Sequence, residues 1–345
     1  MIKKASLGSA GYVLSIVIPT YNRAELLQFL IKSIIYDFNF WPEDLELVII
    51  DNASTDHTRE MVERYIFEGV PIRLVVNKCN IGMDGNLAAC FNISEAKYLW
   101  QIGDDEVLYQ GCAKYVLNFC RTKDFGLLHI ESVGFLKGEQ AGQLVHKIPE
   151  KINPRLLNST QIIRRANVFL TFISANIVNR HLLMSEEPKF NSEEEINTYL
   201  PQLAWIYGVL RLSNRHFYIN SPLFGALVGN TGGYRLIEVF GVNLLEITNR
   251  RLCSFFPEAR SIMANSVLTR LLPGELMAIG QKSASCNDFE DECLGLSLEK
   301  AFGHSFILHF TSKGLLSPSR MSRRLIFFGV RLFNIINRKL GYLFL

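Results

Sequence analysis

Short apolar runs alternate with helix-like patterns along the first 130 residues of the chain. Five runs have the length and composition of strands: 14–18 (LSIVI), 45–50 (LELVII), 72–76 (IRLVV), 98–102 (YLWQI) and 125–130 (FGLLHI). Strands that are apolar along most of their length are typical of a sheet that is covered on both faces. The pattern therefore predicts a sheet with helices packed on either side.

The segments between these runs carry apolar residues at helical spacing. The repeats fall within 26–35, 61–66, 87–91 and 115–119, and the second of them follows Ser54 and Thr55, which we expect to cap that helix. Alternation of strands and helices implies parallel pairing with right-handed crossovers. We predict an α/β fold of the Rossmann-like type, with a mostly parallel sheet and flanking helices.

Polar clusters follow each of the first four predicted strands. They are Pro19–Asn22, then Asp51, Asn52, Ser54 and Asp56, then Asn77, Asn80, Gly82 and Asp84, and finally Asp104, Asp105 and Glu106. The carboxyl ends of parallel strands share one edge of the sheet, and ligands bind there. The four clusters together predict a binding site at this edge.

The acidic trio at 104–106 indicates what the site binds. Adjacent carboxylates repel one another, and taken alone such a cluster is more often a solvated turn than a binding site. A divalent cation offsets the repulsion, and oxygen ligands alone favour Mg²⁺ or Mn²⁺. No GxxxxGK[ST] loop is present, and GSAG at 8–11 precedes the first strand, so neither common phosphate-binding fingerprint applies. Phosphates would then be held mainly through the metal.

Four motifs resemble a known family in their order and spacing. They are LSIVIPTYNRAELLQFLIKSI, ELVIIDNASTDHT, NIGMDGN and AKYLWQIGDDEVLYQG, within residues 13–111. Together they resemble the family 2 glycosyltransferases with a GT-A fold, in a version similar to the abequosyltransferase-like enzymes of bacterial O-antigen and capsule assembly. The resemblance implies transfer of a sugar from a nucleotide donor to a hydroxyl of a lipid-linked glycan, with inversion at the anomeric carbon.

The resemblance also implies roles for individual residues. Pro19, Tyr21 and Asp51 match positions that line the nucleotide pocket, and Asn80, Gly82 and Asp84 match the loop under the nucleotide and sugar. Judged without the resemblance, Asp51 is equally a hydrogen-bond acceptor for a base or ribose and a helix cap.

The acidic motif departs from the family pattern in its first position. Gly103 stands where many relatives have an aspartate, so Asp105 matches the metal-binding residue and Asp104 takes the ribose or second metal-ligand role. Gly85 stands where many relatives have an arginine, so a phosphate contact from that arginine is missing.

An inverting displacement needs a general base that takes the proton of the acceptor hydroxyl. The resemblance places this base beyond the stretch FISANIVNR at 172–180. The candidates are Glu186, Glu187, Glu193, Glu194 and Glu195, and among them we favour Glu194 or Glu195. The alternative for each is a residue in the solvated start of a helix.

The last part of the chain differs in charge from the rest. Residues 300–345 contain eight basic residues and no acidic ones, whereas residues 1–299 carry a net charge of −5. In the segment 323–345, Arg324, Arg331 and Arg338 fall on one side of a helical wheel and leucines, isoleucines and phenylalanines on another. A basic amphipathic helix is typical of a segment that binds an anionic membrane surface; the alternative is a helix that docks on the protein or in a dimer.

Composition limits the remaining possibilities. The seven cysteines show neither CxxC pairs nor a disulfide framework, as expected of a reducing compartment, and no run of about 18 apolar residues is present. No nucleic-acid-binding motif accompanies the basic tail. We therefore expect a cytoplasmic protein that is peripheral at the inner face of the cell membrane. The sequence gives no indication of the oligomeric state.

These observations predict a metal-dependent glycosyltransferase with a catalytic GT-A domain at 1–228 and a helical region at 229–345. Two alternatives remain open. One is a sugar nucleotidyltransferase, which would be expected to carry a glycine-rich loop after the first strand, where this chain has PTYNRAE. The other is a non-catalytic family member that binds a nucleotide sugar or acts as a scaffold.

Overall fold

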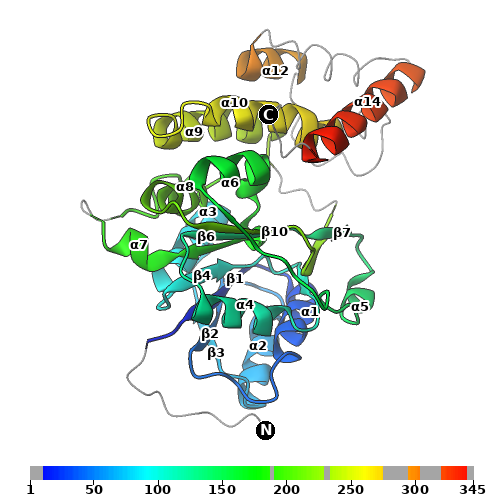
Figure 1. The fold of residues 1–345 in the computed structure, drawn as a ribbon. Coiled ribbons are helices and arrows are strands. Elements are labelled where there is room, and N and C mark those ends of the chain that lie inside the picture. The colour runs from blue at the N-terminus through cyan, green and yellow to red at the C-terminus, as the bar shows by residue number, and fades with distance from the viewer. Residues whose placement is uncertain (1–10, 187–189, 229–233, 275–293, 304–319, 340–345) are drawn as a thin grey trace. The chain divides into compact units, whose positions relative to one another are not determined.

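The computed structural model describes residues 11–186, 190–228, 234–274, 294–303 and 320–339 (Figure 1). The chain folds into two compact units. The first comprises Met1–Ser159, Phe172–Asn197 and Pro201–Gly229, and the second comprises Thr160–Thr171, Thr198–Leu200 and Asn230–Leu345. The second unit thus includes two short segments that the sequence-based division assigns to the first domain; the division into two domains at 228 and 229 stays a prediction.

The first unit is built on an eight-stranded sheet with the order β3-β2-β1-β4-β9-β6-β10-β8. Its strands are β1 (Leu14–Thr20), β2 (Leu45–Asp51), β3 (Ile72–Val76), β4 (Tyr98–Gln101), β6 (Leu127–Ile130), β8 (Arg155–Leu157), β9 (Asn176–Asn179) and β10 (His216–Ile219). β1 pairs in parallel with β2 and β4, and β2 with β3, whereas β9 runs antiparallel to both β4 and β6. The mostly parallel α/β fold is confirmed, and the reversed direction of β9 is a feature that the strand patterns do not predict.

Helices cover both faces of this sheet (Figure 1). Helices α1 (Ala24–Ile35), α2 (Thr58–Phe67) and α4 (Cys112–Thr122) lie on one face, and α3 (Gly82–Ile93), α7 (Arg180–Met184) and α8 (Leu203–Leu212) lie on the other. The first face holds the main core, where Leu27, Met61 and Val116 pack against fully buried strand residues such as Ile16 and Trp100. Burial on both faces explains why β1, β2 and β4 are apolar along most of their length.

Shorter elements complete the first unit. A second sheet has the order β5-β11-β7, formed by β5 (Val107–Leu108), β7 (Val133–Phe135) and β11 (Phe224–Leu227). Helix α5 (Gln140–Gln143) and the 3₁₀ turn η2 (Ile173–Ala175) lie in the connections, and η2 leads directly into β9.

The described elements of the second unit are all helical, as the sequence predicts for the C-terminal region. They are most of α6 (Ser159–Ala166), η1 (Asn167–Thr171), the π-helices η3 (Glu238–Asn243) and η4 (Val267–Leu271), α9 (Leu244–Leu252), α10 (Ala259–Ser266), α12 (Leu294–Phe302) and α14 (Arg320–Lys339). Arg270 links two of these segments, because its Nη1 donates to Asn167 Oδ1 at 2.8 Å and its guanidinium lies over the Phe169 ring. No helix in the described parts of the chain is long and apolar enough to cross a membrane.

One expected helix start is wrong. Helix α2 begins at Thr58, three residues beyond the predicted cap at Ser54 and Thr55. Asp56 serves the start of the helix, since its Oδ1 accepts from Thr58 N at 2.9 Å. Ser54 Oγ accepts instead from Asn22 N, in the loop after β1, so the two loops at the edge of the sheet are joined.

Candidate functional site

The register of the parallel strands brings the predicted polar clusters to one edge of the sheet. Thr20 at the end of β1 pairs with Asp51 at the end of β2, and Asp51 pairs with Val76 at the end of β3. β4 lies on the other side of β1 and leads into the acidic turn at 103–106. The residues discussed below all belong to the first unit.

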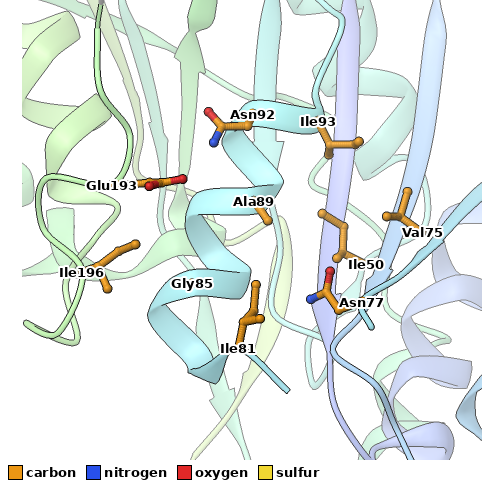
Figure 2. A pocket seen from close by; sticks show the side chains of 10 residues that line it. All are labelled: Ile50, Val75, Asn77, Ile81, Gly85, Ala89, Asn92, Ile93, Glu193 and Ile196. Atoms are coloured by element: carbon orange, nitrogen blue, oxygen red, sulfur yellow. The ribbon is translucent and has the colours of Figure 1, made fainter. Parts of the chain in front are cut away.

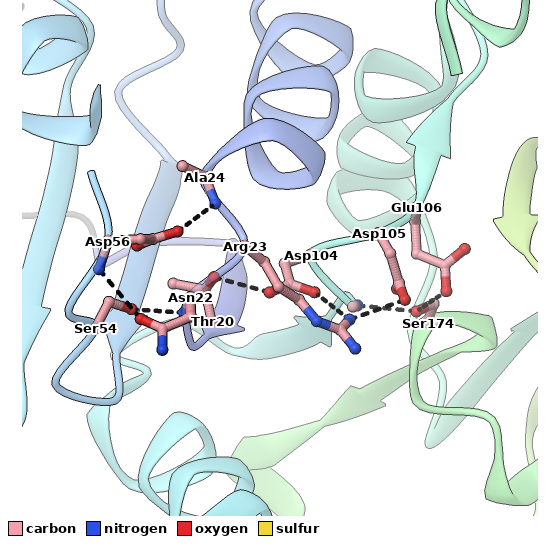
Figure 3. A network of polar contacts seen from close by, with 11 residues as sticks. Thr20, Asn22, Arg23, Ala24, Ser54, Asp56, Asp104, Asp105, Glu106 and Ser174 are labelled. Atoms are coloured by element: carbon pink, nitrogen blue, oxygen red, sulfur yellow. Dashed lines mark hydrogen bonds and ion pairs between the residues drawn. The ribbon is translucent and has the colours of Figure 1, made fainter. Parts of the chain in front are cut away.

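Asp104 and Asp105 are held by the loop that follows β1 (Figure 3). Thr20 Oγ1 donates to Asp104 Oδ2 at 2.8 Å. Arg23 Nη1 donates to Asp104 Oδ1 at 2.9 Å and to Asp105 Oδ2 at 3.0 Å, so one nitrogen joins both carboxylates. The positive charge of Arg23 offsets part of the repulsion between the two aspartates.

Glu106, the third member of the trio, turns toward a different partner. Ser174 Oγ accepts from Gly103 N at 3.0 Å and donates to Glu106 Oε1 at 3.1 Å, while Glu106 Oε2 is buried without a hydrogen-bond partner among the described residues. Ser174 belongs to η2, directly before β9. The side chain of Ser174 therefore fastens the acidic turn to the neighbouring strand.

Gly103 makes this compact turn sterically feasible. A Cβ atom at this position would lie 3.0 Å from Asp105 Oδ1 and 3.4 Å from Glu106 Oε1. The aspartate that many relatives have here would crowd both carboxylates as they are now arranged. The glycine in the first position of the motif is thus matched to the conformation of the turn.

Burial and neighbouring charges shift the pKa values of Asp104 and Glu106. Burial raises the pKa of Asp104 to about 6, with a further increase from the charge of Asp105, although the Arg23 guanidinium and the Thr20 hydrogen bond act in the opposite direction. Burial, followed by the charges of Asp105 and Asp104, raises the pKa of Glu106 well above its ordinary value. A cation bound nearby would stabilise the charged forms of these carboxylates.

Asp51 lies at the centre of the edge and is almost completely buried. Its Oδ1 accepts from Ser54 N at 2.9 Å, and its Oδ2 has no hydrogen-bond partner among the described residues. Because α2 begins only at Thr58, Asp51 does not cap this helix. An unsatisfied, buried carboxylate oxygen at the end of a strand is suited to accept hydrogen bonds from a ligand.

Asn52 joins three of the strand ends, a role that the sequence does not indicate. Its Nδ2 donates to Asn80 Oδ1 at 2.9 Å, and its Oδ1 accepts from Asn77 Nδ2 at 2.9 Å and from Ile81 N at 3.0 Å. Asn77 Nδ2 also donates to Asn86 Oδ1. Asn80 itself accepts from Gly82 N, so the loop that was predicted to lie under the nucleotide is held by side-chain amides.

Asn22 ties the loop after β1 to the loop after β2. With φ at 52° it adopts a left-handed conformation, and its Oδ1 accepts from Thr55 N at 2.7 Å. Ala53, in the facing loop, has φ at 62°. Non-glycine residues with such angles are uncommon and occur often where a loop is shaped for a function.

The other predicted donor-site residues lie around these loops. Pro19 is half-buried within β1, Tyr21 is exposed, Gly82 opens α3 and Asp84 is buried in its first turn. Gly82 has φ at 78°, a conformation that glycine adopts without strain. The roles of these residues in donor binding stay predictions.

The predicted base candidates lie in a separate segment. Glu194 is exposed and Glu195 is fully buried, and both have polar or charged partners. Glu186 lies 3.5 Å from Arg211, and Glu187 lies outside the described residues. The segment forms turns rather than the start of a helix, since α8 begins at Leu203.

Glu193 borders a pocket of about 520 Å³ on the outer side of α3 (Figure 2). The pocket is mostly apolar and lies between the ends of β2 and β3, the helix and the 193–196 turn; its lining comprises Ile50, Val75, Asn77, Ile81, Gly85, Ala89, Asn92, Ile93, Glu193 and Ile196. Ser192 Oγ donates to Asn92 Oδ1 at 2.8 Å, which anchors this turn to α3.

Sequence reasoning missed three polar residues near the edge of the sheet: Arg23, Ser174 and Glu131. Glu131 follows β6 and accepts a hydrogen bond from the Tyr218 hydroxyl. Arg23 and Ser174 lie within stretches that the resemblance singles out, and this was the available signal for them. Glu131 carried no such signal.

The donor set of the acidic turn fits a hard divalent cation. Asp104 and Asp105 offer carboxylate oxygens, the ligands that Mg²⁺ and Mn²⁺ prefer. The described residues contain no group of three or more His, Cys, Asp or Glu side chains arranged to hold a metal ion.

The fold is that of the GT-A glycosyltransferases. Residues 1–349 of S. aureus TarS, crystallised with UDP, superpose with a TM-score of 0.57 at 16% identity, covering 93% of this chain and 91% of that one. The mannosyltransferase PcManGT from Pyrobaculum calidifontis, in complex with GDP-Man and Mn²⁺, gives a TM-score of 0.50 at 14% identity, covering 95% and 88%. At these identities the likeness establishes the fold.

The family follows from the sequence of the first unit. Residues 15–183 match the model of Glycosyl transferase family 2, and the chain thus carries a family 2 glycosyltransferase domain.

Two curated relatives are similar over parts of this domain. The abequosyltransferase RfbV of Salmonella typhimurium is 40% identical over 100 residues, which cover 28% of this chain and 29% of that protein. A GalNAc(5)-diNAcBac-PP-undecaprenol β-1,3-glucosyltransferase of Campylobacter jejuni is 30% identical over 142 residues, covering 40% and 45%. The chain spans less than half the length of these two relatives.

The two hydrogen bonds of Ser174 generate a stability prediction. Ser174→Ala leaves Gly103 N and the buried Glu106 carboxyl group without this partner, so the free energy of unfolding should fall by about 2 kcal/mol. Urea denaturation followed by circular dichroism measures the change. The control is Ser185→Ala, at an exposed serine whose hydroxyl donates to Leu182 O; this variant should remain within about 0.5 kcal/mol of the wild type. Equal stability of the two variants would contradict the proposed fastening of the acidic turn.

Proposed function

We propose that the protein is an inverting glycosyltransferase that moves a sugar from a nucleotide donor to a hydroxyl of a lipid-linked bacterial surface glycan. The observation that carries the proposal is that Asp51 and the Asp104–Asp105 pair lie at the same edge of a GT-A sheet. Thr20 pairs with Asp51 in the strand register and donates a hydrogen bond to Asp104. The name of the Salmonella typhimurium relative supports the transfer of a sugar, and that of the Campylobacter jejuni relative supports an undecaprenol-linked glycan as the acceptor.

Asp51 supplies the contact to the nucleoside. Its buried Oδ2 accepts a hydrogen bond from the base or the ribose, and the exposed Tyr21 ring on the adjacent loop provides an apolar surface beside it. The Asn80–Gly82 loop, held by Asn52, lies across the neighbouring strand end. The bound UDP and GDP-Man of the two structural neighbours support a nucleoside diphosphate as the leaving group.

Asp105, with Asp104, would hold a Mn²⁺ or Mg²⁺ ion. When bound, such an ion neutralises charge on the departing diphosphate. The Mn²⁺ named with the mannosyltransferase neighbour supports this assignment. The chain itself orients the two carboxylates before a ligand arrives. Thr20 and Arg23 both bind Asp104, and Arg23 also binds Asp105.

A carboxylate in the 193–195 turn would take the proton of the acceptor hydroxyl, and we retain Glu194 or Glu195 for this role. The anchoring of the turn on α3 through Ser192 keeps it beside the helix that starts at the Asn80–Gly82 loop. Glu194 is the more accessible of the two, since Glu195 is 0% exposed.

Helix α14 would bring the protein to the inner face of the cell membrane. Its Val330 is buried and Asn334 Nδ2 donates to Thr269 O at 2.6 Å, so one face of the helix docks within the second unit. Phe328, Leu332 and Ile335 are 67%, 47% and 55% exposed and follow one another at spacings of four and three. An exposed apolar stripe on a basic helix is the pattern of an interfacial membrane helix.

The donor site is tested by separating nucleotide binding from metal binding. Asp51→Asn should weaken binding of the preferred nucleoside diphosphate, chosen from UDP, dTDP, CDP and GDP, by about tenfold or more because a charged acceptor is lost. Asp105→Asn should lower the rate of transfer by about a hundredfold or more and remove the effect of Mn²⁺ on nucleotide binding. Thermal-shift titrations and a donor-turnover assay provide the readouts.

The matched control for Asp51 is Asp44, which precedes the same strand at its other end and pairs with Arg121. Asp44→Asn should leave nucleotide binding unchanged. A wild-type protein that binds a nucleotide sugar but turns none over would support the non-catalytic alternative and overturn the proposal.

The base is tested by a panel of charge-neutral variants. Of Glu193→Gln, Glu194→Gln and Glu195→Gln, the variant at the base should lose transfer by about a hundredfold or more while donor affinity is retained. Glu131→Gln belongs in the same panel because Glu131 lies beyond the end of a neighbouring strand. If the loss occurs only at Glu131, the assignment of the base to the 193–195 turn is wrong.

The membrane role is tested by point substitution, because deleting α14 would also uncover Val330 and the partner of Asn334. Phe328→Gln with Leu332→Gln should reduce sedimentation with phosphatidylglycerol vesicles and slow transfer to lipid-linked acceptor, since the apolar burial is lost. Turnover of a short soluble acceptor should be unchanged. Phe255→Gln, at a phenylalanine of the second unit that is 56% exposed, is the control. Sedimentation equal to that of the control would overturn the membrane assignment.

A further inference from the structure

Arg23 makes an unusual pair of contacts at the acidic turn. A single nitrogen, Nη1, donates to both Asp104 and Asp105, at 2.9 Å and 3.0 Å (Figure 3). The guanidinium therefore lies where the negative charge of the two aspartates is concentrated. It is the position that a cation shared by these carboxylates would take.

The rest of the guanidinium is available to a ligand. Within the described part of the chain, neither Nε nor Nη2 of Arg23 makes a hydrogen bond to protein, and the side chain is 35% exposed. Nε and Nη2 carry three of the five N–H groups of the guanidinium. These groups match the spacing of phosphate oxygens in a bidentate contact.

The backbone of Arg23 is held by its neighbours, whereas its side chain is 35% exposed to solvent. Arg23 directly precedes α1, and the neighbouring Asn22 is bonded to Ser54 and Thr55 of the facing loop. Rotation about the long side chain would move the charge away from the carboxylates without moving the loop. The start of α1, with its positive dipole end, also favours an anion in this region.

The charges at this edge of the sheet indicate what the Arg23 side chain would bind after such a movement. Gly85 leaves the chain without the arginine at the start of α3 that the resemblance associates with a phosphate contact. Arg23 offers an equivalent charge from the opposite loop. It also occupies the aspartates that the divalent cation requires.

We propose that Arg23 competes with the divalent cation for Asp104 and Asp105 and, once displaced, binds the diphosphate of the donor. The proposal rests on the proposed function for the identity of the anion. In this scheme each ligand strengthens the binding of the other. The metal ion releases Arg23 from the aspartates, and the diphosphate draws Arg23 away from them.

The experiment titrates two simple probes separately, Mn²⁺ alone and inorganic pyrophosphate alone, by calorimetry on the full chain. Arg23→Gln should bind Mn²⁺ about tenfold more tightly than the wild type because the competing guanidinium is gone. The same variant should bind pyrophosphate about tenfold more weakly because a charged donor is lost. Opposite shifts for the two probes are the signature of the competition.

Two further variants make the outcome decisive. Arg121→Gln removes an arginine that also holds a carboxylate, Asp44, before the start of β2, and it should change neither titration. Arg23→Lys, which keeps the charge but loses the fork, should bind pyrophosphate more weakly while Mn²⁺ binding stays within a few-fold of the wild type.

Several results would overturn the proposal. Unchanged titrations in Arg23→Gln, or a loss of affinity for both probes, would mean that Arg23 only supports the shape of the turn. Retention of the Mn²⁺ titration after Asp105→Asn would place the metal elsewhere. The Mn²⁺ titration needs no sugar nucleotide, so its result is independent of whether the transferase activity is found.

Discussion

The central constraint on this site is the placement of three adjacent carboxyl groups in a turn that is largely shielded from water. Asp104 and Glu106 are destabilised in their charged forms by lost hydration and by neighbouring carboxylates, and their raised pKa values express both effects. The hydrogen-bond partners of these carboxyl groups come from two different segments of the chain. The loop after β1 serves the aspartates through Thr20 and Arg23, and η2 serves the glutamate through Ser174. The turn thereby joins β1, β4 and the segment before β9, and its geometry depends on all three.

The remaining loops of the edge are stabilised by neutral groups. Asn22 and Asn52 use side-chain amides to hold backbone groups of facing loops, so the strand ends are tied together without additional charge. Hydrogen bonds of this kind fix positions while leaving the electrostatic field of the site to the acidic residues and Arg23. The loops that surround a nucleoside diphosphate would then be ordered before the ligand arrives, which lowers the entropic cost of binding.

The sequence allowed the first half of the fold, and the gathering of the polar clusters at one edge of the sheet, to be predicted, because both follow from local patterns. The apolar runs of β1 to β4 are continuous, and the polar clusters that follow them, including Asp51 and Asp105, reach one edge once parallel pairing is inferred. β9 could not be oriented, since its four residues pair with strands that are distant in sequence. Ser174 lies 71 residues from Gly103, and no spacing rule connects them. The helix start at Thr58 was misplaced because Ser54 bonds across loops rather than within its own segment.

Gly103 also limits how the acidic motif can evolve. A side chain at this position would have to share space with Asp105 and Glu106, and the nearest of their atoms lies 3.0 Å from the position of its Cβ. Aspartate at this position therefore brings a tight contact as well as a fourth negative charge. The cost of this change depends on how far the side chains at 105 and 106 can shift, and the Glu106 side chain is held by Ser174. Such dependence of one substitution on the residues around it is epistasis between positions of the motif.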